Sequence, residues 1–343
     1  MAQVRVGLIG CGGISRAHVR GYREHRDAGE VVAVADVDRA RAEERARELG
    51  CGSVYADYQE VLARSDVDAV DICLPHFLHA PVALAAIAAG KHVLVEKPMA
   101  TTLADARRMA DAARGAGRIL MVGHNQRYMP VHQQIKEWID DGILGRVFCI
   151  RADCNQYLKR RDWLTNNREA GGGVVISVAV HKLDLMRWVC GEVRRVAAFG
   201  SKGLGEIEGE DVAVISLEFA DGALGEVVAL YAAKANPWQA MPPVGAAPEY
   251  LILYGTRGVV HTQGGLFISG ENGGGTGDHF RRVDVAGENS FANEVGHFLE
   301  CVATGRQPVS SGQRSLGTMA VLDAVYRSME QRQAVDVEPT PAV

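Results

Sequence analysis

A glycine-rich turn directly after a short apolar segment restricts the fold of this chain more than any other feature. Residues 4–9 read Val-Arg-Val-Gly-Leu-Ile, and Gly10-Cys11-Gly12-Gly13-Ile14-Ser15 follows before helix-compatible sequence begins. Gly10 and Gly12 stand at the first two positions of the G-x-G-x-x-G/A pattern, where the first glycine permits a tight turn and the second lets a pyrophosphate approach the backbone. The third position, which must be small for the helix to pack on the strand, is Ser15. These residues predict a strand, a turn and a helix whose first N–H groups bind phosphate.

The second predicted strand ends in an acidic residue at the distance that a dinucleotide site requires. Residues 31–35 read Val-Val-Ala-Val-Ala, and Asp36 follows them, 21 positions after Ser15. A carboxylate at this place binds the adenosine ribose and repels a 2′-phosphate, which favours NAD over NADP, although Arg39 would offset part of that repulsion. The alternative is that Asp36 caps the helix predicted for residues 40–49.

Strands and helices continue to alternate through the first third of the chain. Such alternation implies a doubly wound parallel sheet with helices on both faces, so residues 1–123 are predicted to form a Rossmann dinucleotide-binding domain. The further strands are expected at residues 69–74, 91–95 and 119–123, and the helices at 59–63, 81–89 and 103–115. His76 and His79 follow the carboxyl end of one of these strands, where a turn or capping role explains them as well as a ligand contact does.

One of these strands ends on a lysine. Val93-Leu94-Val95 runs straight into Glu96-Lys97-Pro98. Because proline disfavours a helical conformation in the residue before it, Lys97 is expected to be extended at the carboxyl end of the strand, the edge at which open α/β sheets bind ligands. Lys97 is therefore either a solvated end of the strand or a functional cation.

The remainder of the chain has a different pattern. Turn pairs such as Asp221-Gly222 separate short apolar segments, which predicts hairpins and a largely antiparallel sheet. Residues 124–312 are assigned to this second α/β domain, for substrate binding and oligomerisation, and residues 313–335 to a C-terminal helix that packs back near the Rossmann domain. The segments are residues 147–154, 193–199, 212–219, 224–231, 251–254 and 259–262.

A helix predicted for residues 174–189 interrupts this series. It follows Gly171-Gly172-Gly173 and carries Ser177, His181 and Asp184, whose spacings of four and three place them on one face. A histidine on such a face is either a hydrogen-bonded core residue or, with an Asp three residues on, a proton donor and acceptor.

Composition excludes several classes of protein. The formal net charge of −5 argues against nucleic-acid and anionic-membrane partners. Seven scattered cysteines without a C-x-x-C pair fit reduced thiols rather than a disulfide framework or a zinc site, and no other spacing indicates a metal site. No apolar segment has the length of a membrane span, and residue 1 leads directly into a strand, so a cytoplasmic protein is expected.

Several of these segments together resemble the Gfo/Idh/MocA oxidoreductases. They are Gly7–Ile14, Glu96-Lys97-Pro98, the Gly171–Gly173 helix with His181 and Asp184, and Phe291–Pro308 leading into the last helix. The resemblance implies an N-terminal Rossmann domain, a C-terminal α/β domain with an open-faced sheet, and tightly held NAD(P). It also implies a cis bond before Pro98 and redox chemistry on a hydroxyl of a sugar, inositol or related polyol.

The resemblance also assigns roles to individual residues. It makes Lys97 the group that positions and polarises the reacting hydroxyl, and His181 the general base for oxidation or the acid for reduction. Many polyol-oxidising relatives have an aspartate where this chain has Ser177, which holds no negative charge. Either Asp184 orients His181, or the proton leaves through Lys97 or Asp162, or the chain has lost activity.

The segment before the glycine-initiated helix is expected to line the substrate pocket. The alternative is an ordinary charged loop. The substrate-binding candidates are Tyr157, Arg161, Asp162, Trp163, Ser177 and Asp184. The cofactor-binding candidates are Gly10, Gly12, Gly13, Ile14, Asp36, Leu74, Pro75, His79, Glu96, Lys97 and Arg127, of which Glu96 and Arg127 are expected to serve mainly as scaffold.

The sequence therefore predicts an NAD-dependent dehydrogenase or reductase that acts on a secondary hydroxyl or ketone of a sugar, sugar derivative or inositol. Lys97 and His181 are the expected proton-transfer residues. The alternatives are a glycosidase that uses NAD in an internal redox cycle and an NAD-binding regulator without turnover. Because an exposed antiparallel sheet needs cover, a homo-oligomer, a dimer or a tetramer, is expected.

Overall fold

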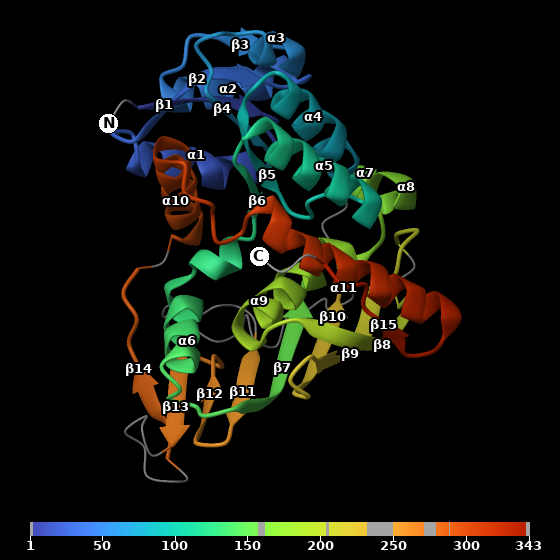
Figure 1. Ribbon diagram of the computed structural model, residues 1–343. Coiled ribbons are helices and arrows are strands. Elements are labelled where there is room, and N and C mark those ends of the chain that lie inside the picture. The colour runs from blue at the N-terminus through green and yellow to red at the C-terminus, as the bar shows by residue number, and fades with distance from the viewer. Residues whose placement is uncertain are drawn as a thin grey trace. The chain divides into compact units, whose positions relative to one another are not determined.

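The computed structural model divides the chain into two compact units, each treated separately below (Figure 1). The first comprises the described residues up to Tyr128 together with Asn289–Met319, and the second runs from Met129 to residue 287 and includes Ala320–Thr340. The structure describes residues 3–156, 162–203, 206–231, 250–270, 279–287 and 289–340, without the side chains of Asp162 and Arg168.

The first unit contains a six-stranded parallel sheet in the order β3-β2-β1-β4-β5-β6. The strand order reverses between β1 and β4, and in doubly wound sheets the carboxyl ends beside such a reversal form the nucleotide site. This topology confirms the predicted Rossmann sheet. The strands are β1 (Val4–Ile9), β2 (Gly29–Ala35), β3 (Val54–Tyr55), β4 (Ala69–Ile72), β5 (His92–Glu96) and β6 (Leu120–Gly123).

Local sequence signals set the ends of the helices in this unit. The Asp38 side chain caps α2 by accepting the N–H groups of Ala40 and Arg41, and Gly50 ends it in the left-handed conformation. Figure 1 shows α4 beside α5 and α1 beside α10. The helices are α1 (Ser15–Glu24), α2 (Arg39–Leu49), α3 (Tyr58–Leu62), α4 (His76–Ala88), α5 (Leu103–Ala116), the 3₁₀ helix η1 (Asn125–Tyr128) and α10 (Ser290–Thr304).

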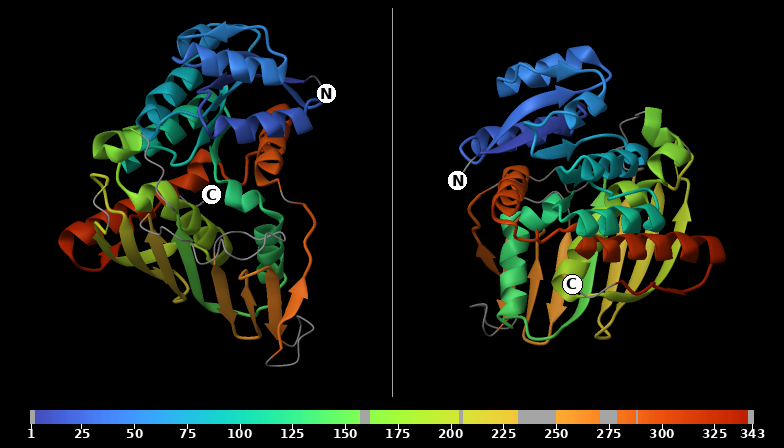
Figure 2. Two further views of the ribbon diagram at one scale, coloured as in Figure 1. Left: turned by 180° about the vertical axis from the view of Figure 1, so that it is seen from behind. Right: turned by 45° about the horizontal axis from the view of Figure 1, so that its top comes forward.

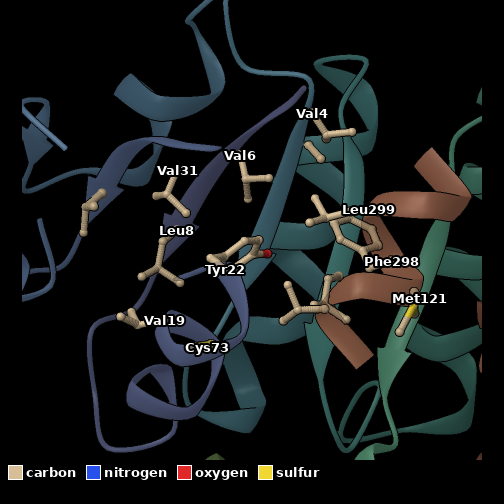
Figure 3. Packing of buried hydrophobic residues seen from close by; sticks show 14 of the residues in the cluster. Val4, Val6, Leu8, Val19, Tyr22, Val31, Cys73, Met121, Phe298 and Leu299 are labelled. Atoms are coloured by element: carbon tan, nitrogen blue, oxygen red, sulfur yellow. The ribbon is translucent and has the colours of Figure 1, made fainter. Parts of the chain in front are cut away.

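The core of this unit joins the start of the chain to a helix near its end. Val4, Val6 and Leu8 of β1 are buried with Phe298 and Leu299 of α10 (Figure 3). The contact between α10 and its neighbours is close, because a Cβ atom on Gly29 would lie 2.5 Å from the Leu299 side chain. The predicted boundaries place this helix in the second domain, whereas its contacts lie within the first unit. Its apolar face shows that the helix is buried but not which surface covers it.

The second unit contains a nine-stranded sheet in the order β14-β13-β12-β11-β7-β10-β9-β8-β15. Only the β7–β10 pair is parallel among the pairs described, which confirms the largely antiparallel sheet. Along β9, Ala213, Ile215 and Leu217 are buried and alternate with more exposed residues. The strands are β7 (Val147–Asn155), β8 (Val193–Ser201), β9 (Val212–Phe219), β10 (Leu224–Leu230), β11 (Leu251–Gly255), β12 (Gly258–His261), β13 (Leu266–Gly270), β14 (Arg281–Val283) and β15 (Val335–Asp336).

Helices of the second unit cover one face of this sheet (Figure 2). Helix α9 packs on β7 and β10, and Ser328 of α11 accepts the backbone N–H of Ala198 on β8 at 2.9 Å. On the other face, Phe199 is 73% exposed and Leu224 is 58% exposed. The helices are α6 (Pro130–Asp140), α7 (Asp162–Thr165), α8 (Asn167–Ala170), the π-helical turn η2 (Val175–Ala179), α9 (Val180–Cys190) and the second half of α11 (Gly312–Gln331).

Candidate active site

The glycine turn between β1 and α1 leaves its backbone open at the positions where a pyrophosphate would lie. Gly10 has φ +93°, and a Cβ atom there would lie 2.5 Å from the carbonyl oxygen of Cys73, so only glycine fits. By contrast, a Cβ atom on Gly12 or Gly13 would have no atom within 4 Å. Ser15 Oγ donates to the Gly12 carbonyl at 2.7 Å and fixes the turn at the start of α1. The geometry fits the phosphates of a dinucleotide at this helix N-terminus.

Asp36 is joined to this turn by a hydrogen bond. Its Oδ2 accepts the backbone N–H of Cys11 at 2.6 Å, and its Oδ1 accepts that of Asp38 at 2.8 Å. Asp38 rather than Asp36 caps α2, which was the alternative role considered for Asp36. Asp36 is half-buried at the end of β2, while the Arg39 guanidinium binds Glu43 at 2.8 Å. An acid in this place fits the diol of an adenosine ribose.

The segment after β4 carries the next cofactor candidates. Leu74 and Pro75 are half-buried and directly precede α4. His79 of α4 is buried, with Nδ1 2.7 Å from the Pro98 carbonyl oxygen and Nε2 2.8 Å from the Leu74 carbonyl oxygen. Burial lowers the pKa of His79, although the two carbonyl groups favour its protonated form. His79 thus lies between the segments that follow β4 and β5, and its neutral ring donates to one of the two carbonyl groups.

Lys97 lies at the carboxyl end of β5, as predicted. It is half-buried, and the Lys97–Pro98 peptide bond is cis, which confirms the expectation from the family resemblance. The backbone N–H of Lys97 donates to Glu96 Oε2 at 3.0 Å. Glu96 itself is buried. Arg127, another candidate, is buried and donates to the Val309 carbonyl at 2.7 Å, a contact that ties η1 to the segment before α11.

In the second unit, a half-buried carboxylate fixes the start of the helix that carries His181. Glu210 accepts the backbone N–H of Gly173 at 3.2 Å and that of Val175 at 3.0 Å, and the Tyr326 hydroxyl donates to it at 3.1 Å. Burial raises the pKa of Glu210, and these N–H groups partly offset the increase. Gly173 must be glycine because a Cβ atom would collide with the Glu210 carbonyl oxygen. The triple glycine therefore permits close packing at this helix N-terminus.

The structure differs from the expected regular helix over residues 174–189. Val175–Ala179, which includes Ser177, forms a π-helical turn before α9 begins at Val180. Ser177 and Asp184 are buried, whereas His181 is half-buried. Single π-helical turns occur frequently at functional sites. A 3.6-residue pattern in the sequence does not distinguish such a turn from an α-helix, because the apolar residues are buried in both.

The predicted substrate segment lies partly outside the described residues. Tyr157 and Arg161 lie outside the described residues, as does the side chain of Asp162. Trp163 lies on the short helix α7 and is half-buried.

Two buried residues near the carboxyl ends of β4 and β5 in the Rossmann sheet were not identified from the sequence. His18 of α1 and Asp71 of β4 form a hydrogen bond of 2.9 Å between Nδ1 and Oδ2. With Cys73 they make the one group of potential metal-ligand side chains found in the described part of the chain. The sequence contained one signal for this pair, which is Asp71 inside the apolar segment 69–74. A carboxylate in a buried strand requires a hydrogen-bonding partner. All seven cysteines lie in the described residues as thiols rather than disulfides. No helix among the described residues is long and apolar enough to span a membrane.

Comparison with known proteins gives matches over nearly the whole chain. Residues 4–124 match the family model of an oxidoreductase family with an NAD-binding Rossmann fold, and residues 132–261 match that of the GFO/IDH/MocA C-terminal domain. D-apiose dehydrogenase of Paraburkholderia graminis is 30% identical, over 98% of this chain and 90% of the relative. 1,5-Anhydro-D-fructose reductase of Ensifer adhaerens is 30% identical, over 97% and 98%. A solved structure of levoglucosan dehydrogenase with NADH and levoglucosan, 24% identical, covers 98% of this chain and 100% of its own with a TM-score of 0.89, which supports the fold.

Proposed function

Because this chain belongs to the GFO/IDH/MocA family of oxidoreductases, we propose that it transfers a hydride between NAD and a secondary hydroxyl or ketone of a sugar, sugar derivative or inositol. The family places it among NAD-dependent dehydrogenases and reductases that act on CH–OH groups. The sugar as substrate class is supported by the names of the D-apiose and anhydrofructose enzymes.

The observation that carries this proposal is the arrangement of the first unit. An open glycine turn follows β1, and a half-buried lysine follows β5 of the same parallel sheet. In such sheets the carboxyl ends of the strands form one edge, so phosphate-binding N–H groups and a cation face the same side. A bound nicotinamide ring supplies the hydride acceptor or donor.

Lys97 and His181 are proposed to handle the proton. The Lys97 ammonium donates to the reacting oxygen and polarises the C–OH group, while a neutral His181 accepts the hydroxyl proton as the carbinol carbon loses its hydride. In the reducing direction the imidazolium returns that proton to the carbonyl oxygen. Ser177 cannot stabilise the imidazolium by charge, so we assign the orienting role to Asp184, the buried carboxylate of the same helix.

NAD is the proposed cofactor in preference to NADP. The carboxylate of Asp36 stands at the end of β2 and is fixed by the N–H groups of Cys11 and Asp38. A 2′-phosphate would meet this negative charge, and the guanidinium of Arg39 already binds Glu43.

The open face of the second unit's sheet is proposed to be covered in a homo-oligomer, a dimer or a tetramer. Phe199, Val214 and Leu224 are large apolar residues exposed on neighbouring strands. Phe199 and Val214 lie directly opposite each other on β8 and β9, and an apolar pair exposed on an open sheet face favours association. Light scattering of the purified protein measures the assembly, and a monomer at micromolar concentration would contradict it.

A substrate screen tests the function. Purified protein is incubated with polyols, monosaccharides and inositols plus NAD or NADP, and the absorbance of the reduced cofactor is followed, then the screen is repeated with Lys97→Ala and His181→Ala. We expect NADH with at least one substrate and losses of about 10²–10⁴-fold in kcat for both variants, the usual range for removal of a proton-transfer group. NAD binding without any NADH would contradict the dehydrogenase. Product formation without net NADH would then indicate the glycosidase, and no product would favour the regulator, for which Ser177 is the supporting feature.

A further inference from the structure

A buried chain of hydrogen bonds leads to the backbone of Lys97. His18 of α1 has Nδ1 2.9 Å from Asp71 Oδ2 and Nε2 2.9 Å from Glu96 Oε1. The other oxygen of Glu96 accepts the N–H of Lys97 at 3.0 Å, and the Tyr22 hydroxyl donates to Asp71 at 3.0 Å. His18 and Asp71 have no exposed surface, and Glu96 is 6% exposed. The order Asp71–His18–Glu96–Lys97 thus runs from β4 through α1 to the end of β5.

The imidazole in this chain lies between two acceptors. A neutral ring carries one N–H, so the ring must be doubly protonated to donate to Asp71 and Glu96 together. Burial alone would lower the pKa of His18, but the Asp71 carboxylate raises it well above its ordinary value. Burial would likewise raise the pKa of Glu96, and the hydrogen bond from His18 lowers it. Glu96 is therefore held ionised and in one orientation.

We infer that His18 and Asp71 are positioning residues for Lys97, acting through Glu96. The inference rests on the proposed function of Lys97. Glu96 fixes the peptide group before the Lys97 side chain, and His79 binds the Pro98 carbonyl after it at 2.7 Å. The imidazolium also offsets the negative charge of Glu96 beside the Lys97 ammonium. Displacement of a reacting group by 1 Å can lower a rate about 100-fold, so an anchor of this kind has a direct effect on turnover.

A purely structural role for the same residues makes a different prediction. Buried ion networks often contribute no more stability than apolar residues of the same volume, which makes stability alone a weak reason for this one. If it served only the fold, any variant with the same loss of stability would affect Lys97 equally. Two isosteric replacements of His18 separate these possibilities, because each keeps one of its two hydrogen bonds.

The amide nitrogen of His18→Asn lies near the position of Nδ1 and retains the bond to Asp71. The amide nitrogen of His18→Gln reaches the position of Nε2 and retains the bond to Glu96. Asp68→Asn serves as the control for a lost carboxylate outside the network. Asp68 directly precedes β4, the strand of Asp71, and pairs with Arg5 at 2.7 Å. All three are made in the full-length protein and compared by thermal unfolding.

The first measurement needs no substrate. The chain has seven lysines, so lysine-selective ¹⁵N labelling gives a simple amide spectrum in which Lys97→Arg identifies the Lys97 signal. We expect hydrogen exchange of the Lys97 amide to be at least about ten-fold faster in His18→Asn than in His18→Gln or Asp68→Asn, because only the first removes the Glu96 anchor. The amide of Lys136 on α6 provides the internal reference.

The second measurement is turnover with the best substrate of the sugar screen. His18→Asn should lower kcat by about 100-fold with the KM for NAD little changed, and His18→Gln should retain more of the activity. Equal exchange rates and equal kcat in the two His18 variants would overturn the inference. If Lys97→Ala leaves kcat intact, the proposed function of Lys97 fails, and the exchange rates still decide whether His18 anchors its backbone. Should His18→Asn not fold, Glu96→Ala with Glu96→Gln as its isosteric control tests the same anchor.

Discussion

Replacing Tyr326 with phenylalanine removes one hydroxyl group from the start of the helix that carries His181. That hydroxyl donates to Glu210 at 3.1 Å and accepts the backbone N–H of Ile176 at 3.3 Å. A hydrogen bond to a charged group contributes about 1.5–3 kcal/mol and a neutral one about 1 kcal/mol. Because Tyr326 and Glu210 are half-buried, water replaces part of the loss, and we expect the free energy of unfolding to fall by about 2 kcal/mol.

Differential scanning calorimetry of the full-length protein measures this change. In a unit of about 150–250 residues, 1 kcal/mol shifts the melting temperature by about 2–4 °C, so the transition of the second unit should move down by about 4–8 °C. The turnover number should fall as well, because the N-terminal turn of the helix orients Ser177 and His181.

The matched control is Tyr58→Phe. The Tyr58 hydroxyl makes no hydrogen bond within the described part of the chain, and its ring is half-buried. Removing it should change the melting temperature by less than about 1 °C, as for most surface substitutions. If Tyr326→Phe unfolds at the same temperature as this control, the hydroxyl does not hold the start of the helix and the reasoning is refuted.

Three further predictions concern the first unit. Gly10→Ala should destabilise the fold by more than about 1 kcal/mol, because Gly10 has a positive φ. Gly12→Ala should keep the melting temperature of the unmodified protein and weaken NAD binding at least about ten-fold by calorimetry. Equal melting temperatures of the two variants would contradict this prediction. Asp36→Asn should shift the ratio of NAD to NADP affinity toward NADP by about ten-fold in a titration of both cofactors, and an unchanged ratio would remove its role in selectivity. The Arg5 guanidinium lowers the pKa of Asp68, so Asp68→Asn should cost about 0.5–1 kcal/mol at pH 7. This difference in the free energy of unfolding should vanish as the pH falls from about 3.9, the value for an unfolded chain, through the lowered pKa of Asp68 in the folded protein. Urea unfolding of both proteins measures it, and a difference that does not change with pH would contradict the pairing of Asp68 with Arg5.

The parts of the fold that depend on local pattern could be predicted from the sequence. Gly10 and Gly12, the acid at position 36 and the alternation of short apolar segments with helices specify a Rossmann sheet, because each signal lies within about 30 residues of the next. The cis bond before Pro98 followed from the family resemblance and is present. The turn at Asp221-Gly222 likewise lies between two paired strands, β9 and β10.

The parts that depend on distant partners could not be predicted in this way. Helix α10 has a clear apolar face, yet nothing in that face identifies β1 and α1 as the surface it covers. His18 lies 53 positions from Asp71 and 78 from Glu96, so its role becomes visible only when three elements pack together. The short strand β15 pairs with β8 at the edge of the second sheet, and two residues carry no usable pattern of their own.

The packing of α10 against the first unit also fixes when that unit can fold during synthesis. Val4, Val6 and Leu8 leave the ribosome first, but Val295, Phe298 and Leu299, which complete their core, follow more than 160 residues after Tyr128. At about 5–20 residues per second, the nascent Rossmann segment waits roughly 10–30 s for its missing helix. Throughout that interval the apolar surface that α10 will cover is exposed, and this is the period in which a chaperone would bind the growing chain.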